Sequence, residues 1–184
     1  MRCPMISAAN PFWEFSVAVY IRPGVEAECL TLQEVACINV MLLLFAAYSG
    51  ARGIALSDSD IVECTALVEP LHSSVLLPLR KARRELKVLT FVSDEGDQFE
   101  QMRERIKLLE LDAEQMIGER LYRFFETCLA ERSASQGVDQ VSCNVAKLLH
   151  LTASGPASIG DCVELLLGAA QLQSDHSSTE DSVV

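Results

Sequence analysis

The fold is decided by the longest apolar run of the chain, which reads Val40-Met41-Leu42-Leu43-Leu44-Phe45-Ala46-Ala47-Tyr48. Its nine residues are about half of the ~20 that a membrane-spanning helix needs, so the run predicts a buried helix and no membrane insertion. Asn39 directly before the run can cap the free N–H groups of the first turn, and Ser49-Gly50 marks its end. We expect this helix to form the centre of the folded chain.

A second apolar helix is predicted at residues 10–20. Asn10 can accept hydrogen bonds from the first turn, and Pro11 is tolerated there because the first turn needs no N–H from it. Aromatic and aliphatic residues cover two faces of this helix and leave little polar surface. We therefore expect it to pack against residues 40–48.

The remaining chain repeats apolar residues at every third or fourth position, which is typical of amphipathic helices. This periodicity predicts helices at about residues 25–35, 57–68, 71–89, 94–132, 138–149 and 158–170. Pro78 is expected to kink or split the helix that contains it, because an interior proline removes a backbone hydrogen bond. The segment 94–132 is either one long helix, which must span the domain or project from it, or two helices joined by a bend at Gly118.

The composition fits one compact helical domain. The chain has 184 residues, of which 49% are hydrophobic and 6% aromatic, and this length favours a single domain. We predict an all-α, single-domain helical bundle of about seven or eight helices at residues 10–172. We expect a flexible N-terminus at residues 1–9 and a disordered acidic tail at residues 173–184.

The stretch Asn10-Pro11-Phe12-Trp13-Glu14-Phe15-Ser16 resembles a bacterial family of uncharacterised proteins that share an N-terminal Asn-Pro-Phe-Trp-x-Phe-Ser motif. The resemblance includes Pro23-Gly24-Val25 and residues 75–87, and it extends more weakly to Leu172. Asn39 and Met41 stand where Asp and Asn are usual in the family, which retains a capping residue and removes a polar one. The resemblance implies a cytoplasmic helical domain of a domain-of-unknown-function family, with no established reaction, cofactor or catalytic residue.

The N-terminus and the cysteines both indicate the cellular compartment of the protein. The first nine residues contain one positive charge and no apolar segment of the length found in signal peptides. Seven cysteines are scattered along the chain without a Cys-x-x-Cys pair, which is typical of reduced thiols. We predict a cytoplasmic protein.

The common signatures of enzymes and metal sites are missing from the sequence. Three isolated histidines, His72, His150 and His176, form no pair with metal-ligand spacing. The chain contains no glycine-rich phosphate loop and no Gly-x-Ser-x-Gly elbow. We predict no catalytic residue, no metal and no cofactor, and the pattern favours a binding protein rather than an enzyme.

A basic segment interrupts this acidic chain, whose net charge is -11. Five of its fifteen basic residues are Arg80, Lys81, Arg83, Arg84 and Lys87, and all but Lys81 share one face of a helix. Such a face is either solvated or internally salt-bridged, or it binds a small anion or the acidic surface of a partner protein. Nucleic acid is disfavoured, because the chain's net charge repels a polyanion and no nucleic-acid-binding motif is present.

Two apolar features leave further alternatives open. The aromatic residues Trp13, Tyr20, Phe45 and Tyr48 either pack in the core or line a pocket between the first and third helices. The segment 94–132 either has a solvated outer face or carries an apolar seam that pairs with another copy or another protein.

From these features we predict a protein–protein interaction adaptor or regulator that uses the basic helical face. The alternative is a small-molecule-binding helical bundle, or less favoured an enzyme, with an apolar pocket near Trp13 and Tyr48. A third hypothesis, an anion- or nucleic-acid-binding regulator, requires binding that depends on Arg83 and Arg84 and falls steeply with salt.

Overall fold

The computed structural model of the chain describes residues 10–90, 96–132, 139–152 and 163–180. These ranges form α-helices and two short π-helical turns, and they contain no β-strand, so the predicted all-α single-domain bundle is confirmed. In chain order the elements are α1 (Pro11–Tyr20), α2 (Val25–Ala36), α3 (Val40–Ala51), α4 (Asp58–Leu71), η1 (His72–Leu76), α5 (Leu77–Thr90), α6 (Gly96–Phe124), η2 (Phe125–Leu129), α7 (Gln140–Thr152) and α8 (Glu164–Glu180).

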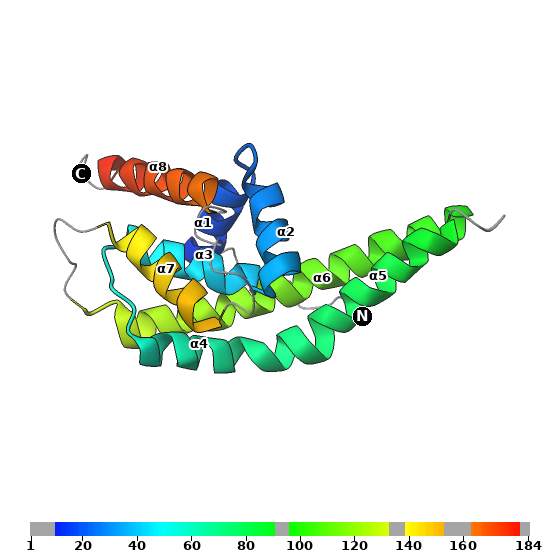
Figure 1. The fold of residues 1–184 in the computed structure, drawn as a ribbon, viewed down its shortest axis with the longest axis horizontal. Helices are drawn as coiled ribbons and strands as arrows, with labels where there is room; N and C mark the ends of the chain where they lie inside the picture. The colour runs from blue at the N-terminus through cyan, green and yellow to red at the C-terminus, as the bar shows by residue number, and fades with distance from the viewer. Residues whose placement is uncertain (1–9, 91–95, 133–138, 153–162, 181–184) are drawn as a thin grey trace.

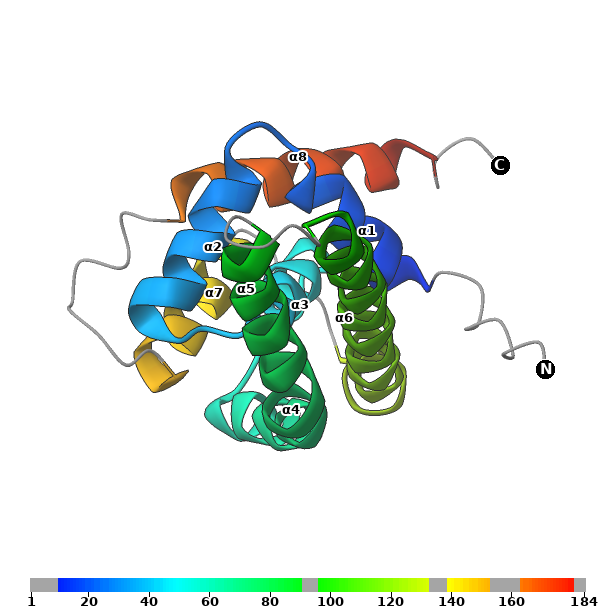
Figure 2. The same ribbon diagram turned by 90° about the vertical axis from the view of Figure 1, so that its right-hand side faces the viewer.

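Helix α3 lies at the centre of the bundle, as expected (Figure 2). Every residue from Met41 to Gly50 is buried, so other elements surround the helix over most of its length. Its first turn is capped by Asn39, whose side-chain oxygen accepts hydrogen bonds from the backbone N–H groups of Met41 and Leu42 at 2.9 and 3.4 Å. The predicted cap and the predicted central helix are therefore both confirmed.

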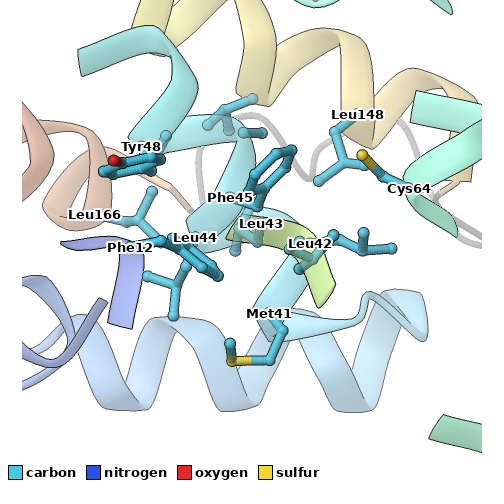
Figure 3. Packing of buried hydrophobic residues seen from close by; sticks show 14 of the residues in the cluster. Phe12, Met41, Leu42, Leu43, Leu44, Phe45, Tyr48, Cys64, Leu148 and Leu166 are labelled. Atoms are coloured by element: carbon cyan, nitrogen blue, oxygen red, sulfur yellow. The ribbon is translucent and has the colours of Figure 1, made fainter. Parts of the chain in front are cut away.

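An aromatic cluster joins α1 to α3. The ring of Phe12 lies 5.5 Å from the ring of Phe45 and 5.5 Å from that of Tyr48, measured between centroids. Tyr48 also contacts Phe125 of η2 at 5.1 Å. Figure 3 shows Phe12, Phe45 and Tyr48 within the same group of packed side chains. Edge-on and tilted contacts of this kind are the arrangement that aromatic pairs prefer, so they stabilise the packing of α1 on α3.

Helix α7 packs very closely against α3, on the side opposite to α1. A Cβ atom added to Gly50 would lie 2.5 Å from the Cα of Val141, so only a glycine permits this approach. The buried side chain of Asn144 accepts a hydrogen bond from the N–H of Leu56 at 2.9 Å and donates one to the carbonyl of Ile54 at 2.8 Å. One α7 side chain thereby satisfies the backbone of the segment that links α3 to α4.

Helices α5 and α6 form an antiparallel hairpin that projects from the body of the molecule (Figure 1). The 29 residues of α6 reach about 44 Å at 1.5 Å per residue. Of the two alternatives for this segment, one continuous helix is confirmed. Gly118 lies inside it, where an added Cβ would be 3.3 Å from a ring carbon of Trp13. The glycine therefore serves the close packing of α1 on α6 and does not bend the helix.

Two prolines lie close to the junction between α4 and α5. We predicted that the fourth helix ends before Pro70, but α4 continues through it and ends one residue later at Leu71. We predicted a kink or split at Pro78, and the structure has instead the π-helical turn η1 directly before α5, in which Pro78 is the second residue. The widened turn, in which the N–H of Leu77 bonds to the carbonyl of His72, accommodates a residue that has no N–H to donate.

The predicted tail begins inside the last helix. We placed the end of the folded domain at residue 172, whereas α8 continues through Glu180. No glycine or proline lies between Gly168 and Glu180, so the sequence offers no strong helix breaker there. The predicted flexible residues 1–9 and the beginning of the predicted helix at residues 158–170 lie outside the described residues.

Candidate functional site: an apolar cavity beside a basic helix

A cavity of about 200 Å³ lies between α1, α2, α3 and the base of the α5–α6 hairpin. An engineered cavity of about 150 Å³ in another protein accommodates benzene, so this one has room for a single aromatic ring or a branched aliphatic chain. Most of its wall is apolar, and the contributing side chains include Trp13, Val17, Ile21, Leu30, Met41 and Leu111.

The apolar rim of the cavity is unusually exposed. Ile21 is 73% exposed, and Val17, Leu30 and Leu111 are each 42 to 43% exposed. Single exposed apolar side chains are normal on protein surfaces. These four come from three helices and the α1–α2 turn, yet they line one opening, and convergence of this kind is typical of binding sites.

An ion pair forms the polar end of the cavity. Arg80 of α5 donates hydrogen bonds to Gln33 of α2 at 2.5 Å and to Glu114 of α6 at 2.7 Å. Its side chain is only 14% exposed, so this arginine joins three helices from inside the wall. Nearby, burial together with the negative charge of Glu26 raises the pKa of Tyr20 to about 12, which keeps its hydroxyl protonated at neutral pH.

The hydroxyl of Ser16 is the unsatisfied polar group of this wall. Ser16 is 3% exposed, lines the cavity and has no hydrogen-bond partner among the described residues. A buried polar group without a partner costs about 1–3 kcal/mol. A bound group that exchanged a hydrogen bond with this hydroxyl would remove that cost.

The five basic residues of α5 divide into two sets. Arg80 is used inside the cavity wall, and Arg83 pairs with Glu110 at 2.7 Å. Lys81 makes a loose surface contact with Glu85 at 3.9 Å. Arg84 and Lys87 are exposed and form no ion pair with any described residue. Of the five, Arg84 and Lys87 are therefore the two without an ion-pair partner among the described residues.

The predicted aromatic residues also divide. Trp13 and Tyr20 line the cavity together with Arg80. Phe45 and Tyr48 are 1% and 3% exposed and pack in the core on the other side of α1. The structure thus brings Trp13 and Tyr20 together with Arg80 in one cavity wall.

Sequence reasoning missed three polar residues of the wall, Ser16, Gln33 and Glu114. Ser16 had a usable signal, because it lies three residues after Trp13 and four before Tyr20 and so shares their face of α1. Gln33 and Glu114 come from other helices. Only tertiary packing brings these two side chains to Arg80, so no spacing in the sequence could have indicated them.

The described ranges contain neither a metal site nor a helix suited to a membrane. Within them, no group of three histidine, cysteine or acidic side chains is placed to hold a metal ion. None of the helices in those ranges combines the length and the apolar character needed to cross a bilayer.

Comparison with known proteins gives a family and no activity. Neither the curated proteins nor the solved structures contain a match to the chain. A family profile described as Protein of unknown function (DUF2390) matches residues 11–121, which is more than half of the chain and includes every residue that lines the cavity. The chain therefore belongs to the DUF2390 family of proteins of unknown function.

Proposed function

We propose that this protein is a protein–protein interaction adaptor or regulator that binds an acidic segment of its partner. The observation that carries the proposal is the position of the cavity, whose lining includes Arg80 of α5, the helix on which Arg84 and Lys87 are exposed and form no ion pair with any described residue. The cavity receives one large apolar side chain of the partner, and the basic residues receive carboxylates that follow it. The scattered cysteines support a cytoplasmic location.

The cavity supplies the anchor of this interaction. Protein interfaces obtain most of their binding energy from a few aromatic or aliphatic side chains that fill desolvated pockets. A volume of about 200 Å³ fits one such side chain and is smaller than the ~300 Å³ at which drug-sized ligand sites begin. The exposed rim of Val17, Ile21 and Leu30 would be covered by the residues on either side of the anchor.

The basic residues supply the charge complementarity. Arg84 and Lys87 follow Arg80 by four and seven residues, which places them about 6 and 10 Å further along the same face of α5. A partner segment anchored in the cavity and directed toward the tip of the hairpin would therefore meet two positive charges. Exposed ion pairs contribute little affinity each, but they speed association and select the partner.

A selection from random peptides tests this proposal and requires no identified partner. Short peptides displayed on phage are selected on the wild-type protein and depleted on a Val17→Glu variant, which carries a charge at the cavity rim. The expected peptides share one large apolar residue followed by aspartate or glutamate. Peptides without an acidic preference, or no enriched peptide at all, would contradict the proposal.

Binding constants of one selected peptide then test the basic face. In low salt the double variant Arg84→Glu/Lys87→Glu should bind the peptide about tenfold more weakly, because two attractive contacts become repulsive. Arg123→Glu is the control, since its side chain is 71% exposed on α6 and is not among the residues that line the cavity. Equal affinity of the double variant and the wild type would count against the basic face.

A small apolar ligand is the second candidate occupant, and the unpartnered hydroxyl of Ser16 favours it. The test is thermal denaturation with indole and with p-cresol, each of which has one polar group on an aromatic ring system. A rise in Tm that is lost in Ser16→Ala, together with an empty peptide selection, would place this candidate first. A small anion has less support, because carboxylates already pair with Arg80 and Arg83.

A further inference from the structure

The hairpin carries a second apolar face, on the side of α6 that faces away from the cavity. Met102, Leu109 and Met116 follow one another at seven-residue intervals and are 51%, 52% and 46% exposed. Leu109 precedes the cavity residue Leu111 by two positions, which at 100° per residue places it on the opposite side of the helix. We call Met102, Leu109 and Met116 the outer seam.

Helix α4 covers the continuation of the outer seam at the base of α6. Arg120, four residues after Met116, lies on the same side of α6 and donates a hydrogen bond to the carbonyl of Leu67 in α4. From Met116 toward the N-terminus of α6, the same side of the helix lies in the projecting hairpin (Figure 1). Leu89 of α5 is also 43% exposed and lies on the side of α5 opposite to Arg80 and the cavity.

We propose that a second copy of this chain covers the outer seam. The two α6 helices pair in antiparallel orientation, with Leu109 of each copy at the two-fold axis. In this register Met102 of each copy lies opposite Met116 of the other, because both are seven residues, or about 10 Å, from Leu109. The two hairpins then form a four-helix arrangement, in which the apolar faces are buried between the pairs.

The charges beside the outer seam favour a second copy of this chain as its partner. Arg105 and Asp112 are both exposed, lie on the same edge of the seam and form no ion pair with any described residue. Two-fold pairing about Leu109 brings Arg105 of one copy level with Asp112 of the other to within about 1.5 Å along the axis. The edge is therefore complementary to itself. A purely acidic or purely basic partner would leave one of the two charges opposite a like charge.

A helix pair of this length buries less than the ~1,600 Å² of a standard interface, so we expect a dimer that dissociates in the micromolar range. Sedimentation velocity over a concentration series measures this equilibrium. A reducing agent is required in all samples, because Cys37, Cys128 and Cys143 are exposed and could form disulfides between copies.

Charge reversal provides the test of the register. Arg105→Asp and Asp112→Arg should each weaken dimerisation at least tenfold, since each creates two like-charge contacts across the two-fold axis. The double variant Arg105→Asp/Asp112→Arg exchanges the two charges and should restore the dissociation constant to within about threefold of the wild type. A double variant that dimerises no better than the single ones would overturn the proposed register.

Two exposed positions on the same helix separate the seam from the rest of α6. Leu109→Glu should give a monomer with an unchanged circular dichroism spectrum, whereas Lys107→Glu, at an exposed position about 200° around the helix from Leu109, should leave the dimer intact. A wild-type protein that remains monomeric at about 1 mM would overturn the proposal, as would a dimer that survives Leu109→Glu. None of the seam residues lines the cavity, so peptide binding by Leu109→Glu tests the proposed function separately.

Discussion

Arg83 of α5 donates two parallel hydrogen bonds to Glu110 of α6, from Nε to Oε1 at 2.7 Å and from Nη2 to Oε2 at 3.1 Å. The side chain of Glu110 is only 8% exposed, so this paired geometry holds the two helices in register where the hairpin leaves the body of the molecule. The hydrogen bonds with Glu110 outweigh the effect of burial and raise the pKa of Arg83 above its usual value.

Replacement of Arg83 alone should lower the free energy of unfolding more than replacement of Arg83 and Glu110 together. Arg83→Met leaves the Glu110 carboxylate buried without its partner, and we expect the free energy of unfolding to fall by about 2–3 kcal/mol. Arg83→Met/Glu110→Leu should recover most of that loss, because no buried charge remains. Urea denaturation measures both values. The exposed neighbour Arg84→Met is the control, with an expected change within about 0.5 kcal/mol. If the double variant is as unstable as Arg83→Met, the geometry of the pair and not its desolvation governs stability.

The carboxylate of Asp60 should make the protein sensitive to acid. Burial by itself disfavours the charged form, but hydrogen bonds from Arg132 and Ser57 outweigh it and lower the pKa of Asp60 to about 2. Because the folded pKa lies below the unfolded value of 3.8, the stabilisation is complete above pH 3.8 and is lost as the pH falls toward 2. The difference corresponds to about 2 kcal/mol. Arg132→Met should lower stability at neutral pH and flatten this acid dependence. A profile that keeps its full slope in the variant would assign the acid transition to other groups.

Two glycines in helices should respond to alanine in opposite directions. At Gly50 a methyl group would lie 2.5 Å from the Cα of Val141, so Gly50→Ala must displace α7 and should destabilise the protein by several kcal/mol. At Gly168 no atom lies within 4 Å of the added carbon. Gly168→Ala should therefore stabilise α8 by up to about 1 kcal/mol through helix propensity. Thermal denaturation of the two variants checks both signs, and a mild effect at Gly50 would mean that α7 can move away from α3 at little cost.

The described cysteines should differ widely in reactivity. Cys29 and Cys64 are buried, and burial raises the pKa of Cys29 to about 12 and also raises the pKa of Cys64. Because the thiolate is the reactive species, both should resist alkylation in the folded protein. Exposed Cys37, Cys128 and Cys143 should react first with iodoacetamide. Mass spectrometry of peptides after short labelling resolves each site, and rapid labelling of Cys64 would indicate local opening of α4.

The sequence predicted the parts of the fold that local chemistry controls. Asn10 and Asn39 marked helix starts because a side-chain cap is a property of neighbouring residues, and both caps are present. The continuous apolar run placed α3 at the centre for the same reason. The role of Gly118 could not be inferred, because the residue that requires its small size, Trp13, lies more than a hundred positions away.

The candidate site was predictable only in part. The basic periodicity of α5 was visible in the sequence, but the division between Arg83, which is paired, and Arg84, which has no ion-pair partner among the described residues, depends on where Glu110 lies in space. The same holds for the aromatic residues. Whether Trp13 or Phe45 lines a cavity depends on which neighbouring helix covers each ring.

The packing of α7 on α3 has a consequence for synthesis of the chain. Asn144 contacts Ile54 across 90 residues, whereas Arg83 and Glu110 are separated by only 27. During translation the hairpin can therefore close well before α7 has left the ribosome. Until then the apolar surface of α3 that α7 covers remains open to water in the nascent chain. A chaperone that binds apolar segments would therefore meet this surface of α3 uncovered between the synthesis of α6 and that of α7.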